Sequence, residues 1–382
     1  MKNSFKITAI VCVLLIYIGC KKAEIQTEEY AASPILPQTP YDYENTSNDH
    51  LVTLGRVLFY DKKMSLNNSV SCGSCHQQSK AFCDNKQFSS GLQDGLTRRN
   101  TPPVIVHSTS LFWDGRASDF TTLALMPLVN HIEMKNYDLA KLESKVSNIS
   151  YYPALFIDAY GNDEVTISKI QQALAAFMTN FNFDQNKNLR VQQGLANFTA
   201  EEQIGENLFA GKARCGNCHN GPSFAGWGGS AECIGLDVEY ADNGIGELTG
   251  VTGLGSIEEN NGKFRIPHLL NIEFTAPYMH DGRFKTLEEV VEHYNSGIQA
   301  HPNLSWAFRE FPGFENMSDL QLQLLLDLNH DGEITSDEIP PGTPAKLNLT
   351  ELEKKCLVAY LKTLSDPNVF SDMRFSDPFR VN

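Results

Sequence analysis

Apolar residues recur at helical spacing in several parts of the chain. In residues 167–181 they fall three or four positions apart, which predicts one amphipathic helix, and a similar pattern marks residues 351–364. Alternating patterns typical of strands are few. The hydrophobic pattern therefore predicts a mainly α protein with long loops.

Helix-start signals place two further elements. A Thr followed three residues later by a Glu is a capping-box signature, and it occurs at Thr199 and at Thr286. Glycines predict the ends of these two helices, at Gly211 and at Gly297. Residues 183–197 are polar and irregular in pattern, so we expect a domain boundary there.

The start of the chain has the pattern of an export signal. Two lysines precede an apolar run over residues 7–18, which is too short to cross a bilayer as a helix. A small residue, Gly19, then precedes Cys20, as in a bacterial lipobox. We expect a signal peptide over residues 1–19, lipidation of Cys20, and a flexible tether over residues 20–48. The alternative is an ordinary secretory signal in which Cys20 is incidental.

Hydropathy and charge limit where in the cell this protein is expected and which partners it is expected to bind. No later apolar run approaches the ~20 residues of a transmembrane helix, so we expect an exported, periplasmic or cell-envelope protein that meets the membrane only through its lipid. The chain has 31 Lys and Arg against 46 Asp and Glu, a formal net charge of −15. This balance argues against nucleic-acid binding, which requires a basic face.

Nine cysteines carry the strongest chemical signal. Four of them belong to two C-x-x-C-H motifs, the attachment sequence of c-type haem. Two cysteines three positions apart lie on one helical turn and can reach the two vinyl groups on one porphyrin edge, and the next histidine can ligate iron. The motifs predict two covalent haem c groups on the following residues: Cys72, Cys75 and His76, and Cys215, Cys218 and His219.

A zinc ribbon is the alternative for two C-x-x-C pairs. Ribbon pairs usually lie roughly 15–20 residues apart, whereas these begin at positions 72 and 215. Zinc also has no need of a histidine directly after each pair, so haem fits better. The cysteines left over are Cys83, Cys233 and Cys356. We expect them to be buried free thiols, and the alternative is one disulfide among them.

One haem motif per domain gives the expected organisation. We expect an N-terminal cytochrome c-like domain over residues 49–185 and a C-terminal one over residues 186–382. An insert at about 315–345 matches the EF-hand calcium loop in full. Its expected calcium ligands are Asp327, Asn329, Asp331, Glu333 and Glu338. The alternative is an acidic loop without a metal.

Further motifs accompany the haem sequences, in this order: Arg99-Asn100-Thr101-Pro102, Phe112-Trp113-Asp114-Gly115-Arg116, Glu133-Met134, Ala276-Pro277-Tyr278-Met279-His280-Asp281-Gly282 and Thr286-Leu287-Glu288-Glu289-Val290. The set resembles the bacterial dihaem cytochrome c peroxidase family. That family also includes the dihaem enzymes that mature the tryptophan-derived quinone of methylamine dehydrogenase. The resemblance covers roughly residues 48–379, apart from the acidic insert.

The resemblance implies roles for both haems and for two side chains. The haem on His76 would be the peroxidatic one, and the haem on His219 the electron-transfer one. Trp113 stands where the family places a tryptophan between the haems, and Glu133 matches its distal acid–base residue, which moves protons during peroxide cleavage. From the residues alone, Trp113 is equally a core aromatic and Glu133 a solvated loop residue.

The resemblance also implies ligands for calcium and for the haem carboxylates. Asn100, with backbone oxygens of Thr275 and Pro277, matches the inter-haem calcium site of the family, and amide and carbonyl oxygens suit that cation. Arg116 and Arg265 are candidates to pair with haem propionates. The alternative for both arginines is a surface salt bridge.

The chain departs from the family pattern at three places. Leu123 stands where the family usually has a glutamine, ten residues before Glu133. Many family members have a histidine in the loop after the first motif, as the sixth ligand of the N-terminal haem. Residues 77–99 contain no histidine, so we expect this haem to be five-coordinate at rest. Tyr294 takes the place of the methionine that usually ligates the second haem, as in the quinone-maturing enzymes. Alternatively, Tyr294 belongs to the core.

Together these features predict a dihaem peroxidase that reduces hydrogen peroxide to water with electrons from a small c-type cytochrome or another redox protein. The alternatives are a dihaem oxidase that modifies a protein substrate and a non-catalytic electron carrier. A homodimer is one candidate assembly. The acidic balance of the chain would suit docking of a basic cytochrome.

Overall fold

The computed structural model describes residues 31–39, 41–42, 48–104, 111–182, 185–225, 264–299, 308–310 and 343–380. The chain divides into a small unit, Met1–Ile35 with Phe379–Asn382, and a large unit, Leu36–Pro378. All described helices and strands belong to the large unit. The expected signal peptide, the lipidation site Cys20 and the calcium ligands of the insert lie outside the described residues.

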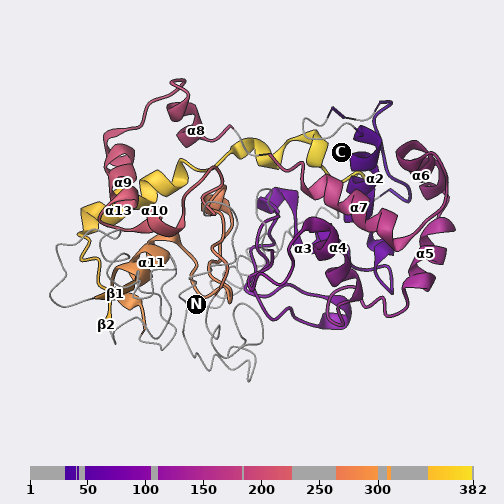
Figure 1. Ribbon diagram of the computed structural model, residues 1–382, viewed down its shortest axis with the longest axis horizontal. Helices are drawn as coiled ribbons and strands as arrows, with labels where there is room; N and C mark the ends of the chain where they lie inside the picture. Colours follow the sequence, from indigo (N-terminus) through magenta and orange to yellow (C-terminus); the bar gives the residue numbers. More distant parts are fainter. Residues whose placement is uncertain are drawn as a thin grey trace, which may run out of the picture. The chain divides into compact units, whose positions relative to one another are not determined.

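The fold is mainly helical, as the sequence predicts (Figure 1). The helices in its first half are α2 (Asp49–Tyr60), α3 (Cys72–Cys75), α4 (Phe120–Val129), α5 (Leu139–Ser147), α6 (Tyr152–Tyr160) and α7 (Ile167–Met178). Those in its second half are α8 (Lys187–Gln192), α9 (Ala200–Ala210), α10 (Cys215–Cys218), α11 (Leu287–Glu292) and α13 (Glu351–Lys362).

Short elements complete the described architecture. The 3₁₀ turns are η1 (Lys62–Met64), η2 (Gln78–Lys80), η3 (Leu92–Asp94), η6 (Ile272–Phe274), η9 (Pro367–Phe370) and η10 (Met373–Phe375). One π-helical turn, η7 (His293–Gly297), continues α11. The two described strands, β1 (Arg309–Glu310) and β2 (Thr343–Pro344), pair antiparallel with Arg309 opposite Pro344.

Two helix pairs form the cores of the two halves, and each pair meets at a glycine. α2 packs on α7 at Gly55, where a Cβ would lie 1.9 Å from the carbonyl oxygen of Ala173. α9 packs on α13 at Gly205, where a Cβ would lie 2.0 Å from the carbonyl oxygen of Cys356. Only a residue without a Cβ permits these approaches, so any other residue would force the helices apart.

The segment after α13 leaves the second half and completes the core of the first. In Figure 1 this yellow segment runs on to α2 and α7. Phe375 is buried, and its ring stacks on Phe181 with centroids 5.0 Å apart. Its carbonyl accepts a hydrogen bond of 2.7 Å from the Tyr60 hydroxyl, and Arg56 donates to the carbonyl of Ser376 at 2.8 Å. The first half therefore depends on residues more than 300 positions downstream.

Several local predictions are confirmed. α7 covers most of the predicted amphipathic helix, and α13 does the same at the second such pattern. α9 has the predicted capping box at Thr199 and ends before Gly211. Cys83 and Cys356 are buried free thiols, so no disulfide joins these two.

Two local predictions need correction. The segment 183–197, expected to be irregular, contains α8, which starts because the Asn186 side chain accepts the Leu189 backbone N–H at 2.9 Å. The helix that opens at Thr286 is regular only to Glu292. It then widens into η7, which includes Tyr294. Such π-helical turns are rare and often lie at functional sites.

Candidate functional site

The first C-x-x-C-H motif forms a short helix that is fixed at both ends. Ser71 precedes α3, and its backbone N–H donates to the hydroxyl of Ser74 at 2.9 Å. A Cβ on Gly73 would lie 2.3 Å from the ring of Tyr60, so this glycine lets α3 pack directly on α2. The thiols of Cys72 and Cys75 are free and three positions apart on this helix.

The histidine that ends this motif is oriented by the backbone. His76 Nδ1 lies 2.9 Å from the carbonyl oxygen of Phe82. Because a carbonyl only accepts, Nδ1 carries the proton of the neutral imidazole, and Nε2 keeps the lone pair that a metal requires. Burial also lowers the pKa of His76, which favours the neutral form. The motif thus presents two thiols and one basic nitrogen to the same place.

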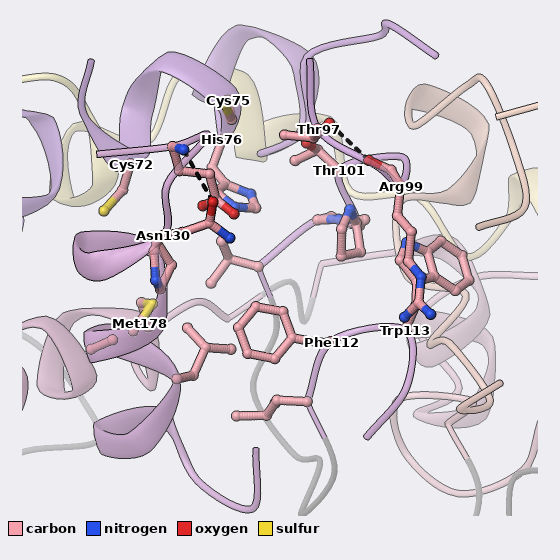
Figure 2. Close-up of a pocket in the computed structure, with 18 of the residues that line it drawn as sticks. Cys72, Cys75, His76, Thr97, Arg99, Thr101, Phe112, Trp113, Asn130 and Met178 are labelled. Carbon is pink, nitrogen blue, oxygen red and sulfur yellow. Dashed lines mark hydrogen bonds between the residues drawn. The ribbon is translucent and has the colours of Figure 1, made fainter. Parts of the chain in front are cut away.

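These three side chains open onto a cavity of about 440 Å³. Figure 2 shows Cys72, Cys75 and His76 on one side of this cavity, and Phe112 and Trp113 on other sides of it. Its wall combines apolar side chains with several arginines, which suits a flat apolar ring that carries acidic groups at one edge. On this donor set the residues present fit a c-type haem.

Glu133 lies on the wall of the same cavity. Burial raises the pKa of its carboxyl group, and the charge of Arg116 opposes this shift. Burial also raises the pKa of the Cys72 thiol to about 12, and the charge of Glu133 adds to this shift. The Asn130 side chain shapes the loop by accepting the backbone N–H groups of Ile132 and Glu133 at 2.8 and 3.3 Å.

Trp113 ties together four segments that are distant in sequence. Its indole N–H donates to the carbonyl of Asn100 at 2.8 Å, and its own carbonyl accepts the backbone N–H of Arg265 at 2.8 Å. The backbone N–H of Asn100 donates in turn to the carbonyl of His280 at 2.7 Å. Residues 100, 113, 265 and 280 therefore form one junction on the edge of the cavity, which we call the Trp113 junction.

The arginines of this region are paired within the protein. Arg116 lies over the Phe112 ring at 3.7 Å and binds Asp114 at 2.7 Å, and its side chain is 42% exposed. Arg99 reaches the same carboxylate at 3.0 Å. The Nε of Arg265 donates to the carbonyl of Phe112 at 2.8 Å. For Arg116 the salt-bridge alternative is thus realised, and its pairing with a haem propionate stays a prediction.

The second C-x-x-C-H motif repeats the geometry of the first. α10 holds Cys215 and Cys218 as free thiols, and His219 Nδ1 lies 2.9 Å from the carbonyl oxygen of Phe224. Burial raises the pKa of Cys215 to about 12. The described surroundings of this motif end at residue 225 and resume at 264.

Tyr294 belongs to η7 and packs with two aromatic neighbours. Its ring lies 5.7 Å from that of Phe308 and 5.4 Å from that of His293. It also contacts the small apolar cluster at Ile298. Its ligation of iron stays a prediction.

The residues predicted to hold an inter-haem calcium ion lie on neighbouring segments. The bond from Asn100 to His280 brings Asn100 to the segment that contains Thr275 and Pro277. The Asn85 side chain fixes that segment, because it donates to the carbonyls of Phe274 and Ala276 at 3.1 and 2.7 Å. This proximity agrees with the prediction, and the metal itself stays predicted.

One buried residue near both motifs escaped the sequence analysis. His268 is 4% exposed, lines the cavity, and has no hydrogen-bond partner on either ring nitrogen among the described residues. Its local sequence, Ile-Pro-His-Leu, carries no motif that would have drawn attention to it. Asn130 was missed for the same reason, since only the folded loop shows what it binds.

The mainly helical fold and the two matched motifs define the class of this protein, that of the di-haem c-type cytochromes. The chain belongs to the di-haem cytochrome c peroxidase family, whose model matches residues 49–196. The family membership expected from the motifs is confirmed. In the described residues, no helix has the length and hydropathy needed to cross a membrane.

Named relatives come from both branches of this family. The chain is 34% identical to cytochrome c551 peroxidase of Nitrosomonas europaea, over 75% of this chain and 84% of that protein. It is 31% identical to the methylamine utilization protein MauG of Methylorubrum extorquens, over 71% of this chain and 76% of that protein.

Solved structures share the fold. A MauG-like protein associated with microbial copper homeostasis is 29% identical, with a TM-score of 0.68, over 91% of this chain and 98% of that one. The diheme peroxidase BthA of Burkholderia thailandensis is 20% identical, with a TM-score of 0.59, over 93% of this chain and 97% of that one. The second likeness supports the fold alone.

Proposed function

We propose that this protein is a di-haem peroxidase that reduces hydrogen peroxide to water with electrons from a small c-type cytochrome or a similar redox protein. The observation that supports it most is that Glu133 and the His76 motif share one cavity. A carboxylate that faces a haem-binding cavity is what proton transfer during peroxide cleavage requires. Peroxidase names among the relatives agree with this activity.

The haem sites follow from the two motifs. One haem would be held by Cys72, Cys75 and His76 and the other by Cys215, Cys218 and His219. At the first site the iron would supply peroxide binding and cleavage of the oxygen–oxygen bond. Each motif would form the centre of one cytochrome c-like domain, residues 49–185 and residues 186–382.

Glu133 has the protonation behaviour that this reaction needs. It would accept a proton from the bound peroxide at one carboxylate oxygen and return it to the leaving oxygen. Burial raises its pKa above that of an exposed carboxyl group, which makes it a better base for this cycle. Leu123 and Phe112 keep the cavity wall apolar beside it.

Trp113 would carry electrons from the second site to the first. Its bonds to Asn100 and to the backbone of Arg265 fix the indole at the Trp113 junction. Asn100 with Thr275 and Pro277 would hold a calcium ion beside it. A second calcium ion would bind the insert, and Cys20 would anchor the exported protein through lipid.

Steady-state consumption of hydrogen peroxide tests the proposal. The purified di-haem protein, with a reduced small cytochrome c as donor, should oxidise two donors for each peroxide consumed. Activity should fall as salt rises if the acidic surface docks a basic donor. Absence of turnover with several donors, at full haem content, would favour the electron-carrier alternative.

A protein-modifying oxidase is the second candidate, and Tyr294 is the residue that favours it. The MauG relatives make this branch of the family relevant. If Tyr294 ligates the second haem, Tyr294→Phe should change the absorption and electron paramagnetic resonance spectra of that haem. Tyr160→Phe, at a tyrosine in the first half that donates to Lys169 at 2.7 Å, is the matched control. An unchanged spectrum in Tyr294→Phe would refute the ligation.

A further inference from the structure

His268 is a buried imidazole with unused hydrogen-bonding capacity. Its side chain is 4% exposed, and neither ring nitrogen has a partner among the described residues. Buried polar groups in folded proteins are almost always paired, so an exception requires an explanation. Neither the proton transfer nor the electron transfer described above uses this residue.

The position of His268 links the two haem sites. It lines the cavity onto which Cys72, Cys75 and His76 open, together with Trp113 and Arg265. The backbone of the preceding residue, Pro267, lies close enough to His219 in the second motif to raise the pKa of that imidazole. His268 therefore belongs to a segment near one haem-motif histidine, while its side chain lines the cavity at the other motif.

The charge state of His268 follows from these surroundings. Burial holds its pKa well below the ordinary value, and the nearby charge of Arg265 lowers it further. The imidazole is therefore neutral and has one N–H donor and one acceptor nitrogen. The described residues offer this donor no acceptor, whereas a haem bound in the cavity would bring one.

Haem brings only one kind of strong acceptor to its edge, namely its two carboxylates. Arg265 lies beside His268 on the cavity wall and makes the region favourable for a negative charge. We propose that His268 donates a hydrogen bond to a haem carboxylate at the boundary between the two haem sites. His268 is then a positioning residue, and the carboxylate comes either from the haem on His76 or from the haem on His219.

Loss of this donor has a predictable consequence. Without the hydrogen bond, the carboxylate keeps more of its negative charge close to the iron, which stabilises the ferric state. The haem that His268 touches should therefore become harder to reduce. The proposal rests on the haem attachment proposed above and is independent of peroxidase activity.

The test compares three variants with the wild-type holoprotein. His268→Leu removes the donor, His268→Gln restores an N–H donor, and His50→Gln changes an exposed histidine on α2 as the control. Haem content is measured first, because loss of haem would indicate failure of the attachment rather than of this contact. Resonance Raman spectra of the carboxylate bending modes and a potentiometric titration of both haems then follow.

We expect His268→Leu to shift one carboxylate bending band. The reduction equilibrium of the same haem should move about tenfold toward the oxidised form, or ~59 mV for one electron. His268→Gln should recover most of both shifts, and His50→Gln should match the wild type. The haem whose optical bands titrate differently identifies the source of the carboxylate.

Two results would overturn the proposal. One is a His268→Leu protein with both haems, unchanged bending bands and unchanged potentials. The other is a change of axial ligation in its electron paramagnetic resonance spectrum, which would make His268 an iron ligand instead. If His268→Leu fails to bind both haems, His268→Phe, which is also planar and has neither a donor nor an iron-ligating atom, replaces it in the same measurements.

Discussion

The two C-x-x-C-H sites have the same local structure but different surroundings. Both motifs form four-residue helices, α3 and α10, and both end in a histidine whose Nδ1 lies 2.9 Å from a downstream backbone carbonyl. The backbone bond fixes each imidazole for metal binding. The motif alone would therefore account for haem attachment at both sites.

The two motifs differ in the charged groups that shift the pKa of their first cysteine. Glu133 adds to the burial that raises the pKa of Cys72, whereas burial and Cys218 account for the upward shift at Cys215. A carboxylate that lines the same cavity thus acts on the first cysteine of the first motif, whereas no carboxylate among the described residues contributes to the shift at the first cysteine of the second motif. The comparison indicates that two copies of the C-x-x-C-H pattern can differ in chemistry through side chains supplied by distant loops.

The largest expected effect comes from removing this carboxylate. Glu133→Gln should lower kcat/KM for peroxide by about 10²–10⁴-fold, because the amide cannot accept and return a proton. Haem content and the spectra of both haems should stay as in the wild type. Glu288→Gln, at an exposed acid of α11 in the second half, should leave turnover unchanged. An equal loss of turnover in both variants would contradict the specific role of the carboxylate at the first site.

The next effect concerns how each half completes its core. Phe375→Ala should destabilise the first half by about 3–5 kcal/mol, because the cavity opens against Phe177 and Phe181. Leu357→Ala, at a buried position of α13, should destabilise the second half by about 2–5 kcal/mol instead. Denaturant unfolding, followed through the bands of each haem, distinguishes the two. Loss of the second haem's signal first in Phe375→Ala would contradict the assignment.

The smallest effect is a shift in pH dependence. Proton acceptance needs ionised Glu133, so activity should fall as pH drops through its pKa, which burial raises. Arg116 lowers that pKa, and Arg116→Leu should therefore move the acidic limb of the pH–rate profile to higher pH. Arg190→Leu, on α8, is the control. A limb that moves to lower pH would show that Arg116 acts on another group.

The sequence specifies much of this fold locally. The capping box at Thr199 and the C-x-x-C spacing predict α9, α3 and α10, because these signals depend on a few neighbouring residues. The family motifs also point to Glu133 and Trp113, which the structure places on one cavity wall.

The remaining features depend on contacts between distant segments. The role of Gly55 appears only where α7 crosses α2, and that of Phe375 only where it meets the first half. His268 has no local signature, because its importance lies in the partner that its buried nitrogens lack. The π-helical turn at Tyr294 likewise follows an ordinary helix start and could not be inferred from it.

The contacts of residues 375 and 376 also impose an order on the maturation of the protein. A chain made from its N-terminus delivers Cys72 and Cys75 early, together with α2. Tyr60 and Arg56, however, receive their partners only 315 and 320 residues later. The first haem motif is therefore translated early, but the core beside it is complete only when residues 375 and 376 have been added. If haem is attached before then, the attachment takes place while the surroundings of this motif are still open.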